Sequence, residues 1–149
     1  MPHVLIVCYG NPLRGDDAVG WRAAERLQAA IDNPEVEILT VHQLTPELMD
    51  PLSRVARAIF IDAAQGGEPG EIRERRIDAA AAIPNFTHHA TPEGLVGGAL
   101  RLYGQAPEAV LFTIAAASFE IGEELSAPVR DAVAVLVERV LASIPSSGS

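Results

Sequence analysis

Runs of apolar residues long enough to form buried strands alternate along the chain with segments in which apolar residues recur at helical spacing. Continuous apolar runs of this kind are typical of strands that are covered on both faces of a parallel sheet. The clearest such runs are residues 3–9 and 58–61, and further strands are predicted at residues 36–41, where Glu37 and Thr40 interrupt the apolar residues, and at residues 110–115. The helical segments are residues 16–32, 45–52, 91–104 and 126–144. This alternation predicts an α/β domain with an open, mostly parallel, twisted sheet and helices on both faces.

A further strand is predicted at residues 71–77, where charged side chains dominate. A strand of this composition suits the edge of a sheet, because its charges discourage pairing with other chains. The sheet should therefore contain about five strands. Right-handed crossovers between parallel strands bring successive loops to the carboxyl edge of the sheet, where open α/β folds bind their ligands. Functional residues are expected at that edge.

The length of 149 residues predicts a single domain spanning residues 1–149, in which residues 145–149 form a frayed tail. With 48% hydrophobic and 21% charged residues, the chain can bury a sizeable core. The net charge of −9 argues against binding to nucleic acid or to anionic membranes and favours cationic partners or metal ions. The sequence contains neither a signal-peptide pattern nor a membrane-spanning apolar segment, so we expect a cytoplasmic protein, and a monomer.

Several classes of chemistry are excluded by the residue types present. The sequence has no lysine, which argues against P-loop nucleotide hydrolysis, pyridoxal chemistry and Schiff-base mechanisms. Cys8 lies in an apolar run and is expected to be a buried thiol rather than a nucleophile. No serine stands in a Gly-x-Ser-x-Gly motif, and Ser126 is expected to cap the last helix. The chain therefore offers no activated serine, cysteine or lysine as a nucleophile.

The densest group of candidate residues lies between the first strand and the first helix, at residues 10–17. The backbone amides of this loop could cradle an anion, but the adjacent carboxylates of Asp16 and Asp17 would repel a phosphate there. We expect Asp16 to cap the helix. Since one cap is enough, Asp17 is free to point across the sheet edge.

Two further segments supply candidate metal ligands. Asp62 ends the apolar run 58–61, and a charge at this position must be hydrated, paired or metal-bound, although it could also simply cap the following turn. His88 and His89 precede the helix that begins at Thr91 and Pro92, and either could also be a solvated loop residue. Two carboxylates and one imidazole at one edge would form an open three-ligand site for a divalent transition metal.

Four separated motifs, in the same order, resemble segments of the nickel-iron hydrogenase maturation endopeptidases. They are GNPLRGDDAVG at residues 10–20, QLTPEL at residues 43–48, IDA at residues 61–63 and THH at residues 87–89. The resemblance covers about residues 3–144 and includes the last helix. Ala18 and Tyr9 depart from it, because glycine is common at both positions in the family.

The resemblance implies an endopeptidase that removes a C-terminal extension from the precursor of a nickel-iron hydrogenase large subunit, once nickel has been inserted. It implies that Asp17, Asp62 and His89 bind the metal, with His88 as the alternative histidine, and that Asp17 and Asp62 are the catalytic residues. The nickel carried by the substrate would complete the site, while another divalent cation could occupy it in isolation.

Two other functions are compatible with the same residues. One is a non-catalytic domain of the same fold that binds or carries a divalent metal. The other is a small-molecule hydrolase or phosphorylase whose loop at residues 10–15 faces an anion.

Overall fold

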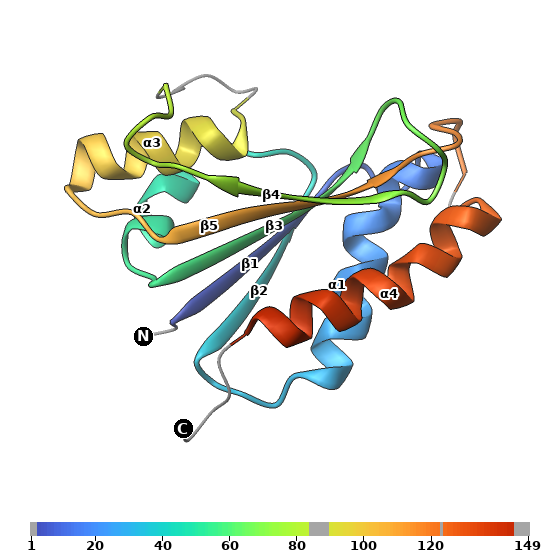
Figure 1. The fold of residues 1–149 in the computed structure, drawn as a ribbon, viewed down its shortest axis with the longest axis horizontal. Coiled ribbons are helices and arrows are strands. Elements are labelled where there is room, and N and C mark those ends of the chain that lie inside the picture. The colour runs from blue at the N-terminus through green and yellow to red at the C-terminus, as the bar shows by residue number, and fades with distance from the viewer. Residues whose placement is uncertain (1–2, 84–89, 123, 145–149) are drawn as a thin grey trace.

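The computed structural model describes residues 3–83, 90–122 and 124–144 and contains one mixed sheet with the strand order β2-β1-β3-β5-β4. Four strands are parallel to one another and β4 runs antiparallel to β5 at one edge. The strands are β1 (Val4–Tyr9), β2 (Val36–Val41), β3 (Arg57–Ala64), β4 (Ile72–Ile77) and β5 (Glu108–Ala115). The predicted fold class is therefore confirmed, including the charged edge strand (Figure 1). The proposed tail at residues 145–149 lies outside the described residues.

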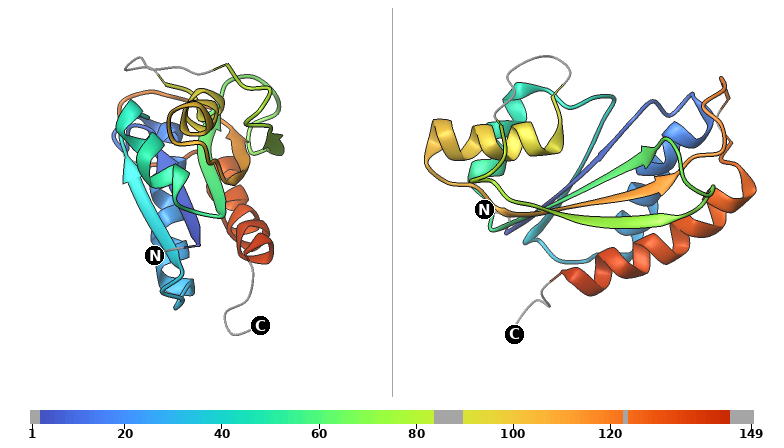
Figure 2. Two further views of the ribbon diagram at one scale, coloured as in Figure 1. Left: turned by 90° about the vertical axis from the view of Figure 1, so that its left-hand side faces the viewer. Right: turned by 45° about the horizontal axis from the view of Figure 1, so that its top comes forward.

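Helices cover both faces of the sheet, with α1 and α4 on one face and α2 and α3 on the other (Figures 1 and 2). The helical elements are η1 (Gly15–Ala18), α1 (Val19–Ala30), η2 (Pro46–Leu48), α2 (Met49–Ser53), α3 (Pro92–Tyr103) and α4 (Ala127–Ser143). Along β1, Ile6 and Cys8 pack towards α1 and α4, whereas Leu5 and Val7 pack towards α2 and α3. A strand with two buried faces must be apolar at every position, which explains the unbroken apolar runs.

The structure differs from the predicted boundaries in two places that matter for function. The expected helix at residues 16–32 is divided into the short 3₁₀ helix η1 and α1, so Asp16 and Asp17 lie in the tight turn rather than at the start of an α-helix. Strand β3 continues to Ala64, with Asp62 paired in register with Thr113 of β5. Asp62 thus lies inside a central strand, where pairing with β5 restricts its position.

The start of α3 matters because this helix follows the His88–His89 segment. Thr91 is its N-cap, and its hydroxyl oxygen accepts a hydrogen bond of 3.0 Å from the Gly94 amide. Gly104 ends the helix in the left-handed conformation, with φ = +74°. Both ends agree with the sequence prediction. The same Thr-Pro-Glu sequence at Thr45 was also expected to cap a helix, but the Thr45 side chain makes no capping hydrogen bond.

We expect Thr91→Ala to lower the free energy of unfolding by about 1 kcal/mol, because it removes the acceptor for one helix N-terminal amide. Thr45→Ala is the matched control, since Thr45 also precedes a proline but its side chain caps no amide, and its effect should be close to zero. Urea unfolding followed by circular dichroism measures both. Equal losses for the two variants would contradict the assigned cap.

No helix within the described ranges is both long enough and apolar enough to cross a membrane.

Candidate functional site

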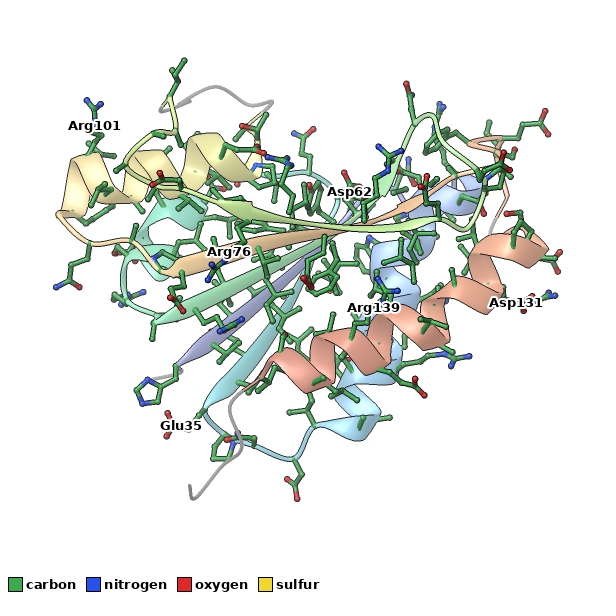
Figure 3. All side chains as sticks on the ribbon, viewed as in Figure 1. Glu35, Asp62, Arg76, Arg101, Asp131 and Arg139 are labelled. Carbon is green, nitrogen blue, oxygen red and sulfur yellow. The ribbon has the colours of Figure 1, made fainter. Side chains whose placement is uncertain are left out.

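A pocket at the carboxyl ends of β1, β2 and β3 brings Asp17 and Asp62 together, as the sequence analysis expected. The residues that line it are Tyr9, Gly10, Asp17, His42, Gln43, Leu44, Asp62 and Ala90. Figure 3 shows Asp62 towards one end of the sheet, with Glu35 at the opposite end. The pocket therefore collects side chains from four separate segments of the chain.

The Asp17 carboxylate is oriented by the loop that precedes it. Its Oδ2 atom accepts a hydrogen bond of 2.7 Å from the Asn11 amide. The loop approaches η1 so closely at Gly10 that a Cβ atom there would lie 2.3 Å from the Asp17 carbonyl oxygen, and Gly10 has φ = +137°. Only glycine satisfies both constraints. The glycine after the first strand is thus needed to bring Asp17 to the pocket.

The Asp62 carboxyl group is hard to ionise in this position. The pKa of Asp62 is raised from 3.8 to about 7, mainly by burial and also by the charge of Asp17, while hydrogen bonds from the Ala63 amide and the Tyr9 hydroxyl act in the opposite direction. The Ala63 amide lies 2.8 Å from Oδ1. Burial also raises the pKa of Tyr9, and the nearby charge of Asp62 adds to this, so Tyr9 remains a neutral donor. The charge of Asp17 thus opposes the ionisation of Asp62.

We expect the metal-free protein to become less stable as the pH rises from about 4 to about 7. The folded state retains a proton on Asp62 in this range that the unfolded chain releases near its ordinary pKa of 3.8, so unfolding becomes more favourable with rising pH. The contribution should approach about 4 kcal/mol at most and be constant above about pH 8. Urea unfolding in the presence of a chelator, at intervals from pH 5 to pH 8, measures it.

Asp62→Asn should flatten that profile, because the amide does not titrate. Asp131→Asn is the control, since Asp131 is exposed on α4 (Figure 3). Wild-type and Asp62→Asn profiles that run parallel would contradict the perturbed pKa of Asp62.

Asp16 is not the helix cap that the sequence suggested. It is buried, and its carboxylate accepts hydrogen bonds from the amides of Ala117, Ser118 and Ser126 and from the Ser126 hydroxyl, at 2.7–3.0 Å. Burial raises its pKa, but these hydrogen bonds together lower it below the ordinary value. Ser126 stands at the N-cap position of α4, as expected, but its side chain donates to Asp16 and does not cap the helix. Asp16 therefore links the loop that follows β5 to the loop that follows β1 through hydrogen bonds.

The loop at residues 10–17 does not form an anion cradle. The amides of residues 10, 11 and 13–17 all donate to acceptors within the protein, and Pro12 has no amide hydrogen. A phosphate would need several of these amides to point outwards. The structure thus contradicts the alternative of an anion-binding hydrolase or phosphorylase at this loop.

His88 and His89 lie outside the described residues. Ala90, which follows them directly, lines the pocket. Within the described part of the chain, no group of three or more His, Cys, Asp or Glu side chains is arranged to hold a metal ion. The assignment of a histidine ligand therefore stays a prediction.

His42 is a pocket residue that the sequence analysis missed. Its ring meets the indole of Trp21 edge-on, with 5.4 Å between the ring centroids and 73° between the planes. Trp21 is itself fixed by a hydrogen bond of 2.8 Å from its Nε1 to the Gly10 carbonyl oxygen. The signal that identified Asp62, a polar residue next to the carboxyl end of an apolar strand, applies equally to His42 after residues 36–41.

Comparisons with known proteins agree on one family. The model of the family described as "Hydrogenase maturation protease" matches residues 21–143. The hydrogenase 3 maturation protease of Escherichia coli K12 is 32% identical over 99 residues, which cover 59% of this chain and 58% of the relative. The chain thus spans less than two thirds of that protein in the match.

Two other relatives are covered more fully. The hydrogenase 2 maturation protease of Escherichia coli K12 is 29% identical over 153 residues, covering 97% of this chain and 92% of the relative. The structure of the hydrogenase maturating endopeptidase HybD from E. coli superposes with a TM-score of 0.81 at 26% identity, covering 99% of this chain and 94% of the other. The family match extends over most of the chain and the fold agrees, so this protein belongs to the hydrogenase maturation protease family.

Proposed function

We propose that this protein is an endopeptidase that removes a C-terminal extension from the precursor of a nickel-iron hydrogenase large subunit after nickel has been inserted. Membership of the maturation protease family supports the activity and the class of partner. The observation that carries the proposal is that Asp17 and Asp62, from separate segments, line one pocket at the carboxyl edge of the sheet. A divalent cation would relieve the repulsion between two carboxylates placed so close together.

In this proposal, Asp17 and Asp62 bind the nickel that the substrate carries, and His89, or alternatively His88, provides the third protein ligand. The Asn11 amide fixes the Asp17 carboxylate and the Ala63 amide fixes the Asp62 carboxylate, so both are oriented before the substrate arrives. Preorganised ligands bind without a large cost for ordering side chains. A precursor without nickel would lack the bridging ion and would bind weakly, which would protect immature protein from cleavage.

The same two carboxylates are the groups available to activate water. In the metal-free site the pKa of Asp62 is about 7, so this carboxyl group can gain and lose a proton near neutral pH. Cys8 is no alternative nucleophile, because it is fully buried and burial raises its thiol pKa to about 12. Cleavage by water, with an aspartate as the proton acceptor, is therefore the mechanism that this chain's residues favour.

The decisive experiment incubates the protein with nickel-loaded and nickel-free large-subunit precursor and follows the C-terminal extension by mass spectrometry. We expect cleavage of the loaded form alone. Binding of the loaded form without cleavage would contradict the proposal and favour the non-catalytic metal-binding alternative. Equal cleavage of both forms would contradict recognition through nickel.

The choice between the two histidines is tested by single alanine substitutions. We expect His89→Ala to lose cleavage and His88→Ala to retain it, because the resemblance to the family aligns His89 with the ligand position. The measurement is the initial rate of extension release, with circular dichroism as the check on folding. The reverse result would transfer the ligand role to His88.

The nickel is proposed to enter with the substrate, and another divalent cation could bind in its absence. The cytoplasmic location and the monomeric state expected from the sequence stay predictions. Sedimentation velocity of the purified protein tests the second of these.

A further inference from the structure

The side chains that line the pocket differ in their hydrogen-bonding character. Asp17 and Asp62 contribute carboxylates, which accept hydrogen bonds when ionised. His42 and Gln43, which follow β2, line the same pocket, and their side chains carry N–H groups that can donate hydrogen bonds. The pocket therefore combines carboxylates with side chains that carry N–H groups. Hydrolysis of an amide requires both: a group to take a proton from water and a group to stabilise the carbonyl oxygen.

The contacts of Trp21 fix His42 in this position. The Trp21 side chain links three parts of the site, because it begins on α1, donates its hydrogen bond to Gly10 after β1 and contacts the His42 ring after β2. Gly10 in turn donates its amide hydrogen to the Val41 carbonyl oxygen at 3.2 Å. The His42 ring contacts the Trp21 indole, which is itself fixed by a hydrogen bond, and it remains exposed to solvent. An incoming polypeptide can therefore reach it.

A purely structural role does not account for His42. Across residues 3–83, 90–122 and 124–144, no hydrogen bond or ion pair from its ring to another side chain is present. It is exposed, so it fills no part of the core. A role as a metal ligand beside the two aspartates is not supported either, because the described side chains contain no three-residue metal-binding arrangement.

We propose that His42 is a catalytic residue that donates a ring N–H hydrogen bond to the carbonyl oxygen of the peptide bond that is cleaved. This inference rests on the proposed endopeptidase function and assigns a role to a residue outside the metal-binding set. In the reaction, the oxygen of water bonds to the carbonyl carbon while one of its protons passes to an aspartate. The carbonyl oxygen gains negative charge and is stabilised by His42. The C–N bond then breaks, and the aspartate returns the proton to the leaving amine.

Three variants test the proposal in the full-length protein with nickel-loaded precursor as substrate. His42→Ala should lower kcat about 100-fold, as the loss of one oxyanion donor does elsewhere, while KM changes less than about threefold. His42→Gln, which keeps an N–H donor, should have a kcat at least about tenfold higher than that of His42→Ala. His3→Ala is the matched control, because His3 is exposed and pairs with Glu35 far from the pocket (Figure 3), and it should cleave like the wild type.

A second measurement separates catalysis from binding and folding. The affinity for the nickel-loaded precursor, measured by biolayer interferometry, and the Tm should be unchanged in His42→Ala. A wild-type kcat in His42→Ala, a defect confined to KM, or equal rates for the Ala and Gln variants would overturn the assignment of His42. Failure of both the wild type and His3→Ala to cleave would instead overturn the proposed function.

Discussion

Asp62→Asn will yield a protein that is more stable than the wild type at pH 8 and that no longer cleaves the hydrogenase precursor. The gain in stability follows from removal of a buried charge, since burial raises the pKa of Asp62 to about 7. The loss of activity follows from its proposed roles, because removing a general base typically costs about 10²–10⁴ in rate. Urea unfolding and the rate of extension release measure the two effects on the same preparation.

The expected gain in stability and loss of activity have opposite signs, and this distinguishes a defect in the site from a defect in folding. A variant that is inactive because it is poorly folded would lose stability as well, which the expected result excludes. Asp131→Asn provides the control for an exposed aspartate and should change neither quantity. If Asp62→Asn cleaved the precursor at the wild-type rate, Asp62 would be neither ligand nor base, and the proposed site would be wrong.

Asp16→Ala is expected to destabilise the protein by about 4 kcal/mol, although the residue lies next to the proposed ligand Asp17. Three backbone amides and the Ser126 hydroxyl would lose their common acceptor, and hydrogen bonds to a charged group contribute about 1.5–3 kcal/mol each before water replaces part of the loss. Ser126→Ala removes only the hydroxyl and should cost about 1 kcal/mol. Urea unfolding at pH 7 compares the two variants.

The pH dependence identifies the origin of the Asp16 effect. The pKa of Asp16 is lowered in the folded protein, so its contribution is present above about pH 4 and is lost as the pH falls through the lower folded value. The difference in unfolding free energy between wild type and Asp16→Ala should therefore shrink in acid. A difference that is small at pH 7, or that does not change with pH, would contradict the role of the ionised carboxylate.

The sequence predicted the sheet and the position of Asp62 because both depend on local patterns. Apolar runs define strands that are buried on both faces, and Asp62 follows such a run. The role of Asp16 could not be predicted in this way, because its hydrogen-bond partners lie more than 100 residues away and include backbone amides of a loop without a distinctive pattern. The local sequence predicted that Asp16 caps a helix, whereas in the structure its carboxylate binds distant amides instead.

The two threonines at predicted helix starts also show that local sequence alone does not determine hydrogen bonding. Thr91 and Thr45 precede identical Pro-Glu pairs, yet only the Thr91 side chain accepts a capping hydrogen bond. Thr91 precedes α3, an α-helix of twelve residues, whereas Thr45 precedes a 3₁₀ segment of only three residues. His42 was overlooked although it directly follows the strand predicted at residues 36–41.

The hydrogen bonds of Asp16 also have a consequence for the order in which the site can form during synthesis. The segment that carries Asp17 is synthesised before Ser126, which donates two of the hydrogen bonds that hold the neighbouring Asp16. A nascent chain that stops before this residue lacks part of the network that fixes the pocket. The protein should therefore acquire its complete site only after Ser126 has been synthesised.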